Sequence, residues 1–122
     1  MRILLVEDNA MNVEFFRDAL EGEGHEIVVE REGDTGEQRA RDERFDLLIL
    51  DVRLPGRSGE EVCRRLRAEG MRVPILGLSS DAMPDQISRG IAAGFDKYLT
   101  KPISAADLRA AVRAHAPPEP SG

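Results

Sequence analysis

Short apolar runs alternate along the chain with longer amphipathic stretches, and the alternation repeats five times. The apolar runs predict β-strands at about residues 2–6, 26–30, 46–50, 74–78 and 96–99. The first, third and fourth runs are continuously apolar, as expected for strands buried on both faces, whereas the second is bracketed by charge and suits a sheet edge. Strands that alternate with helices form parallel sheets covered on both faces, so the pattern predicts an α/β fold.

The stretches between the strands carry helix signals. Asparagine or serine stands at the expected start of three of them, at Asn9, Ser58 and Ser104. The stretch 84–93 has the weakest helical pattern, because it begins with a proline and contains Gly90. We expect one domain over residues 1–116, followed at 117–122 by a proline-rich tail or the start of a linker.

Composition and charge narrow the class of protein. The 122 residues fit a single domain with a substantial core. A net charge of −6 argues against direct nucleic-acid binding, and no apolar run is long enough to span a membrane. Cys63 is the only cysteine and a strand pattern begins at once, which favours a cytoplasmic protein without a signal peptide.

Groups that could hold or transfer a phosphoryl group stand at the ends of four predicted strands. Glu7 and Asp8 follow the first strand, Asp51 ends the third, Ser79 ends the fourth, and Lys101 follows the last. In an open parallel sheet, ligands bind outside the carboxyl ends of the strands. The sequence therefore predicts that three carboxylates, a hydroxyl and an ammonium group converge on a site for one divalent cation and one phosphoryl group.

Each of these residues also has a plainer interpretation. Glu7 and Asp8 repel each other, which Mg²⁺ would relieve, but alone they would be a solvated acidic turn. Asp51 could attack phosphorus to give an aspartyl phosphate, or it could be a turn aspartate. Ser79 alone would be a strand-end residue, with Ser80 as a rival hydrogen-bond donor, and most lysines are simply exposed. The functional interpretation gains its weight from the whole set.

The whole set resembles a known family. Segments 3–9, 48–59 and 94–103 resemble response-regulator receiver domains, and the motifs run in the family's order from Met1 to about Ala114. The Glu-Asp-Asn-x-x-Asn opening and the short tail are most similar to single-domain receivers of bacterial phosphorelays. The resemblance implies a doubly wound, flavodoxin-like sheet of five parallel strands in the order 2-1-3-4-5.

The resemblance also implies a role for each site residue. Asp51 would accept a phosphoryl group from a phosphohistidine on another protein, with Lys101 and Ser79 binding the phosphoryl oxygens. Tyr98 would turn inward when Ser79 moves. Mg²⁺, with Mn²⁺ as an alternative, would be held directly by Asp8 and Asp51.

The resemblance implies two further groups at the metal site. Glu7 would act through water, and Arg53 would offer its backbone carbonyl. We also expect Arg53 and Asp81 to pair across the mouth of the site and slow dephosphorylation, the alternative being two independent solvated side chains.

The implied function is a signalling switch rather than an enzyme, acting catalytically only in transfer to Asp51 and slow hydrolysis from it. Its partners would be a sensor histidine kinase or histidine phosphotransfer protein, docking on helix 9–22, and a downstream protein that reads the 84–103 face. No direct nucleic-acid or membrane partner is expected. One alternative is a small phosphatase or phosphotransferase with an aspartyl nucleophile, which Arg53 disfavours because such enzymes carry a second acid there. Another is a degenerate receiver that only binds protein, which the retained site residues disfavour.

Overall fold

The computed structural model describes residues 1–81 and 83–116, so the tail expected at 117–122 lies outside the described residues. Strands and helices alternate in the order β1 (Arg2–Val6), α1 (Ala10–Glu21), β2 (Glu26–Glu30), α2 (Gly33–Asp42), β3 (Leu47–Asp51), α3 (Gly59–Ala68), β4 (Ile75–Ser79), α4 (Pro84–Ala93), β5 (Lys97–Thr100) and α5 (Ala105–His115). Each predicted strand is found within one residue of its expected position.

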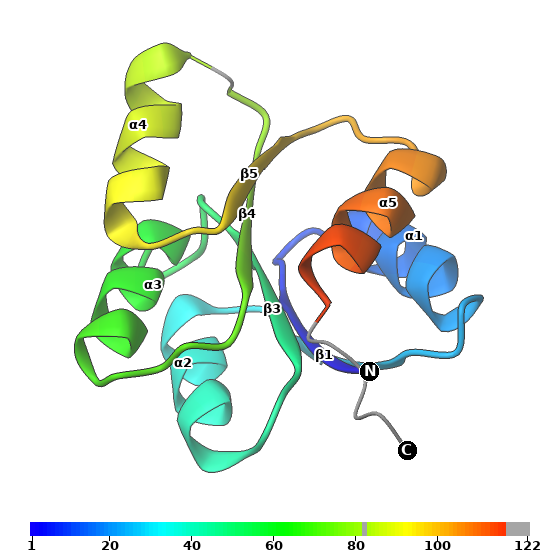
Figure 1. The fold of residues 1–122 in the computed structure, drawn as a ribbon, viewed down its shortest axis with the longest axis horizontal. Helices are drawn as coiled ribbons and strands as arrows, with labels where there is room; N and C mark the ends of the chain where they lie inside the picture. Colours follow the sequence, from blue (N-terminus) through cyan, green and yellow to red (C-terminus); the bar gives the residue numbers. More distant parts are fainter. Residues whose placement is uncertain (82, 117–122) are drawn as a thin grey trace.

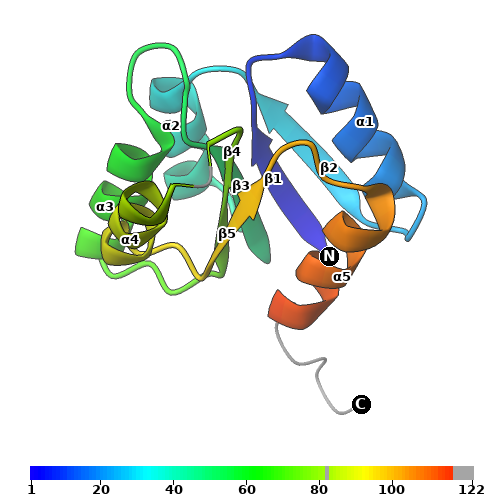
Figure 2. The same cartoon turned by 90° about the horizontal axis from the view of Figure 1, so that it is seen from above.

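The strands form one parallel sheet in the order β2-β1-β3-β4-β5, which confirms the predicted topology and places the charge-bracketed β2 at an edge. Helices cover both faces. Figures 1 and 2 show α1 and α5 together on one face of the sheet and α2, α3 and α4 on the other. The register sets Asp51 opposite Leu78 and Ser79 opposite Thr100, so β3, β4 and β5 end at neighbouring points of the same edge.

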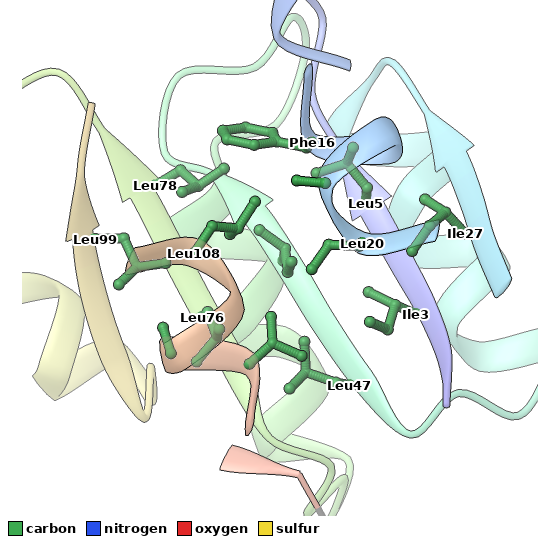
Figure 3. Packing of buried hydrophobic residues seen from close by; sticks show 14 residues of the cluster. Ile3, Leu5, Phe16, Leu20, Ile27, Leu47, Leu76, Leu78, Leu99 and Leu108 are labelled. Carbon is green, nitrogen blue, oxygen red and sulfur yellow. The ribbon is translucent and has the colours of Figure 1, made fainter. Parts of the chain in front are cut away.

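Two apolar layers explain why the central strands are continuously hydrophobic. Successive side chains of a strand point to opposite faces. Ile3 and Leu5 therefore join the layer beneath α1 and α5, whereas Leu4 and Val6 join the layer beneath α2, α3 and α4. Figure 3 shows the first layer, in which Phe16 packs with the strand residues. Burial on both sides holds the sheet rigid, so the strand ends present their polar residues in fixed positions.

The predicted helix starts are confirmed by their capping bonds. The Asn9 side chain accepts a hydrogen bond from the Asn12 N–H at 3.0 Å, and the Ser104 hydroxyl accepts from the Asp107 N–H at 3.0 Å. Ser58 caps α3 in the same way. Each cap satisfies a backbone donor that the first helical turn leaves free.

Helix α4 forms despite its weak pattern, and the glycine that weakened it has a packing role. A Cβ atom at Gly90 would lie 2.8 Å from the Tyr98 ring and 2.9 Å from the Phe95 ring. Glycine thus lets the helix close against both aromatic rings, and the helix ends at Gly94, whose φ of 114° suits glycine. Tertiary packing outweighs the low local propensity here.

Candidate functional site

Strands β1 and β3 bring the three predicted carboxylates together at the carboxyl edge of the sheet. One oxygen each from Glu7, Asp8 and Asp51 lies within 4.8 Å of the others. Glu7 and Asp51 are buried, with 0% and 4% of their surfaces exposed, whereas Asp8 is exposed to solvent. Two buried carboxylates beside an exposed one make a concentrated negative site that opens to solvent on one side.

Lys101 enters this site from the end of β5. Its ammonium nitrogen lies 2.5 Å from Oδ2 of Asp51 and 3.2 Å from Oε1 of Glu7. Its backbone N–H donates to the Ser79 carbonyl at 2.7 Å, which ties the β5 end to the β4 end. The following Lys101–Pro102 peptide bond is cis.

The charge of the site is incompletely balanced. Three carboxylates and one ammonium group leave a formal charge of −2. The pKa of Glu7 is raised to about 7, chiefly by burial and then by the neighbouring Asp51 carboxylate, which together outweigh the lowering by Asn12 and Lys101. Burial lowers the pKa of Lys101, but the hydrogen bond to Asp51 and the two negative charges outweigh burial, so the net shift is upward. Lysine therefore stays charged in the site.

Glu7 shows directly what the site lacks. Its Oε1 accepts from the Asn12 side chain at 2.6 Å and from Lys101, but its Oε2 is buried and has no hydrogen-bond partner among residues 1–81 and 83–116. An unsatisfied buried carboxylate oxygen costs free energy. A hard divalent cation, which takes only oxygen ligands, would satisfy that oxygen and offset the excess charge, so the residues present fit Mg²⁺.

Local backbone structure holds Asp51 in place. Its Oδ1 accepts a hydrogen bond from the Arg53 N–H at 2.8 Å, within the loop that follows β3. Helix α3 begins tightly against this strand end, since a Cβ atom at Gly59 would lie 2.1 Å from the Asp51 carbonyl oxygen. Asp51 therefore has one oxygen fixed by its own loop and the other held by Lys101.

Ser79 and Tyr98 are linked through the β4–α4 loop. The buried Ser79 hydroxyl accepts from the Asp81 N–H at 3.0 Å, and the Tyr98 hydroxyl donates to the Asp81 carbonyl at 3.1 Å. A displacement of Ser79 would remove the acceptor of the Asp81 N–H. The loop therefore connects the hydroxyl at the site to the aromatic residue on β5.

The expected pairing of Arg53 with Asp81 is not formed. The ion pairs among the described residues do not include it, and Arg53 is exposed. The Asp81 carboxylate instead accepts from the Met83 N–H at 3.2 Å and from the Gln86 side chain at 2.9 Å. Hydrogen bonds from the start of α4 thus occupy the Asp81 carboxylate that the expected pair with Arg53 required.

Two contributors were not assigned a role from the sequence. Asn12 belonged to the acidic opening motif, but its contact with Glu7 depends on how α1 leaves the sheet. Gln86 carried no signal beyond its place in a weak helix. For Asn12, the spacing of three residues from the cap at Asn9 was the available signal, because the third helical position can reach back toward the strand.

The fold and the site define an α/β domain with an acidic, lysine-containing site at the carboxyl edge of its sheet. A sequence model of the response regulator receiver domain matches residues 3–113. The chain belongs to this family and is a receiver domain of the kind found in two-component response regulators. The crystal structure of the chemotaxis protein CheY4 of Vibrio cholerae is similar in fold to this chain, with a TM-score of 0.87 at 26% identity, covering 93% of this chain and 97% of that one.

Relatives cover the chain almost entirely. The phosphate regulon transcriptional regulatory protein PhoB of Rhizobium meliloti is 43% identical over 115 residues, covering 93% of this chain and 51% of the regulator. Two-component response regulator ORR41 of Oryza sativa subsp. japonica is 38% identical over 108 residues, covering 85% of each. The chain spans about half the length of the transcriptional regulators that it matches.

A solved structure extends the comparison to the site. The receiver domain of sensor histidine kinase PA1611 from Pseudomonas aeruginosa PAO1 superposes with a TM-score of 0.86 at 32% identity, covering 93% of this chain and 95% of that one. That structure holds a magnesium ion coordinated in its active site cleft.

The helices of residues 1–81 and 83–116 include none with the length and apolar character of a membrane span.

Proposed function

We propose that Asp51 accepts a phosphoryl group from a phosphohistidine on a partner protein. The observation that carries the proposal is the position of its carboxylate, which lies buried at the end of β3 beside two other acids and in direct contact with Lys101. An Asp51 oxygen would attack phosphorus while the phosphorus–nitrogen bond of the donor breaks and leaves its electron pair on the imidazole.

Lys101 would change partners during this transfer. It contacts the Asp51 oxygen in the structure, and the phosphoryl oxygens would form beside that oxygen. A compact ammonium group can follow the negative charge from carboxylate to phosphoryl group. The Ser79 hydroxyl, which accepts a hydrogen bond from the Asp81 N–H in the structure, would turn to a phosphoryl oxygen.

Asp8, Asp51, Glu7 and the Arg53 carbonyl would hold Mg²⁺, or Mn²⁺ in its place. The acidic cluster and the unsatisfied Glu7 oxygen support this assignment, and the magnesium ion in the PA1611 receiver adds to it. When bound, the metal supplies positive charge against the phosphoryl oxygens. Glu7 acts through water in this scheme; its side chain is fully buried, whereas Asp8 is exposed.

The output would be a shift between two arrangements of the α4–β5 surface. Movement of Ser79 would remove the acceptor of the Asp81 N–H. The Asp81 carbonyl in turn accepts the hydrogen bond of the Tyr98 hydroxyl. Phosphorylation therefore biases the loop, Tyr98 and α4 together. A downstream protein partner that reads this surface would distinguish the two states.

A histidine kinase or histidine phosphotransfer protein would dock on α1. Met11 and Phe15 on this helix are 80% and 41% exposed, although both are large and apolar. A cleft of about 230 Å³ beside Lys101 lies between α1 and the segment after β5. It is lined by Asn12, Phe15, Phe16, Lys101, Pro102 and Ile103. With such partners, the domain would act in the cytoplasm.

Acyl-phosphate treatment tests the central assignment. With acetyl phosphate and Mg²⁺, the intact mass should rise by one phosphoryl group, and alkaline treatment should remove it. Asp51→Asn should show no increase, whereas Asp42→Asn, which changes an exposed aspartate on α2, should behave as the wild-type protein. Full labelling of Asp51→Asn would exclude the assignment, and rapid turnover of external phosphate esters would support a phosphatase instead.

The two surfaces are separable by a second experiment. Phe15→Ser should slow uptake from a phosphohistidine partner but leave uptake from acetyl phosphate unchanged. Tyr98→Ala should weaken binding of the downstream partner and leave both uptake rates intact. Equal losses of uptake in the two variants would argue against the division of surfaces.

A further inference from the structure

Asn12 belongs to the acidic opening motif, and the proposed function gives its side-chain amide no role at the cation site. It is the third residue of α1, and its backbone N–H is held by the Asn9 cap at 3.0 Å. Its side chain turns back toward β1 and donates to Oε1 of Glu7 at 2.6 Å. In a capping box the side chain at this helical position also reaches back, but there it meets the cap residue's own N–H.

This contact determines which oxygen of Glu7 is free. Rotation about the last bond of a glutamate is soft, so an isolated carboxylate would turn readily. Here both donors, Asn12 and Lys101, meet Oε1, and the buried Oε2 receives no hydrogen bond from the part of the chain that the structure describes. The fold thereby leaves Oε2 of Glu7 available for a ligand inside an acidic cluster.

We propose that Asn12 is a positioning residue, whose amide fixes the Glu7 carboxylate by Oε1 and so presents Oε2 to the divalent cation or to its water. The inference rests on the cation site of the proposed function. It adds a residue that is not itself among the proposed metal ligands. Partners that orient a metal-binding group commonly change metal affinity by 10- to 100-fold when they are replaced.

Lys101 cannot perform this task alone. Its nitrogen lies closer to Asp51, at 2.5 Å, than to Glu7, at 3.2 Å. In the proposed function it leaves toward the phosphoryl oxygens, and Asn12 then remains as the donor to Glu7 among the described contacts. An amide is also neutral, so it orients the carboxylate without competing with the cation for negative charge, as a second lysine would.

Calorimetric titration of the unphosphorylated protein with MgCl₂ tests the inference. Asn12→Leu keeps the side-chain volume and the backbone N–H that Asn9 caps, and it should weaken Mg²⁺ binding by about tenfold. Gln38→Leu is the matched control, because it removes another amide-to-carboxylate hydrogen bond, to Asp42 at 2.9 Å on the distant α2. The control should bind Mg²⁺ as the wild-type protein does.

A double variant separates positioning from a merely structural effect. In a Glu7→Gln background, which itself lowers affinity, Asn12→Leu should cause no further loss, because Asn12 acts through Glu7. A thermal melt without metal checks the fold, and Asn12→Ala serves as the second variant if the leucine variant does not fold. Wild-type affinity in a folded Asn12 variant would overturn the inference, as would an equal loss in both backgrounds. Failure of the wild-type protein itself to bind Mg²⁺ would instead refute the cation site.

Discussion

Glu7 and Glu37 are both buried glutamates, with 0% and 1% of their surfaces exposed, yet their surroundings are opposite. Glu37, on α2, accepts from Arg57 at 3.1 Å and Arg65 at 3.0 Å through Oε1, and from Arg41 at 2.5 Å through Oε2. Both of its oxygens are satisfied. Glu7 has donors on one oxygen only and shares a single lysine with Asp51.

The difference separates a carboxylate that its neighbours satisfy fully from one that the proposed cation site would use. The arginines around Glu37 come from α2, from the loop after β3 and from α3, so the glutamate joins three segments. Guanidinium groups are always charged, and this cluster needs nothing further. The cluster at Glu7 lacks positive charge and one hydrogen-bond donor, and a cation or a phosphoryl-transfer partner can supply what it lacks. Incomplete neutralisation therefore marks the site.

Replacement of Glu37 should have the largest effect on stability. Glu37→Gln removes the charge that three arginines share, and it should lower the free energy of unfolding by about 3 kcal/mol, since breaking a buried ion pair from one side is costly. Urea denaturation measures the change. Labelling of the folded variant by acetyl phosphate should persist, and loss of labelling in a fully folded variant would contradict the separation of the two clusters.

The pH dependence of stability should expose the unmet charge at Glu7. Its pKa is raised from 4.5 to about 7 in the folded protein, so its favourable contribution is complete below pH 4.5 and is lost as the pH rises to about 7. Without divalent cations, stability should fall over this interval. Glu7→Gln, which leaves Asp8, Asp51 and Lys101 in place, should reduce the slope of stability against pH. Thermal midpoints across the interval test this. Mg²⁺ should raise the midpoint more at pH 8 than at pH 5, because it binds the ionised carboxylates.

Asp51→Asn should move stability in the direction opposite to Glu37→Gln. It relieves repulsion at a site of formal charge −2, and Lys101 keeps Glu7 as its partner. At pH 8 without divalent cations, we expect the free energy of unfolding to rise by about 1 kcal/mol, as is common when a functional site is neutralised. A loss as large as that of Glu37→Gln would show that Asp51 is structural.

Glu69→Gln should have the smallest effect on stability of the four substitutions. Glu69 lies at the margin of the Glu37 cluster and forms a bidentate ion pair with Arg41. The Arg41 Nε–Glu69 Oε2 distance is 2.7 Å and the Nη2–Oε1 distance is 2.6 Å, but the Glu69 side chain is half exposed. Exposed ion pairs contribute little because water screens them. Its urea midpoint should match that of the wild-type protein, and a clear loss would mean that the cluster extends to the surface.

Residues near the strand ends illustrate what could be predicted. The positions of Glu7, Asp51 and Ser79 followed from apolar runs that stop at a polar residue, because both the burial pattern and the rule for parallel sheets are local or topological. The topology β2-β1-β3-β4-β5 followed from the resemblance to receiver domains. The expected ion pair of Arg53 with Asp81 is not found among the described residues, and the Asp81 carboxylate instead accepts hydrogen bonds from Met83 and Gln86.

Hydrophobic periodicity, helix caps and the order of polar strand ends were therefore determined by the amino-acid sequence itself, since each depends on neighbouring residues or on the alternation of elements. The tertiary structure alone decided that Glu37 gathers three arginines and that Glu7 retains a free buried oxygen. Both outcomes depend on side chains from distant segments meeting within hydrogen-bond distance. At that scale a difference of an ångström decides which donor reaches which oxygen, and no sequence pattern encodes it.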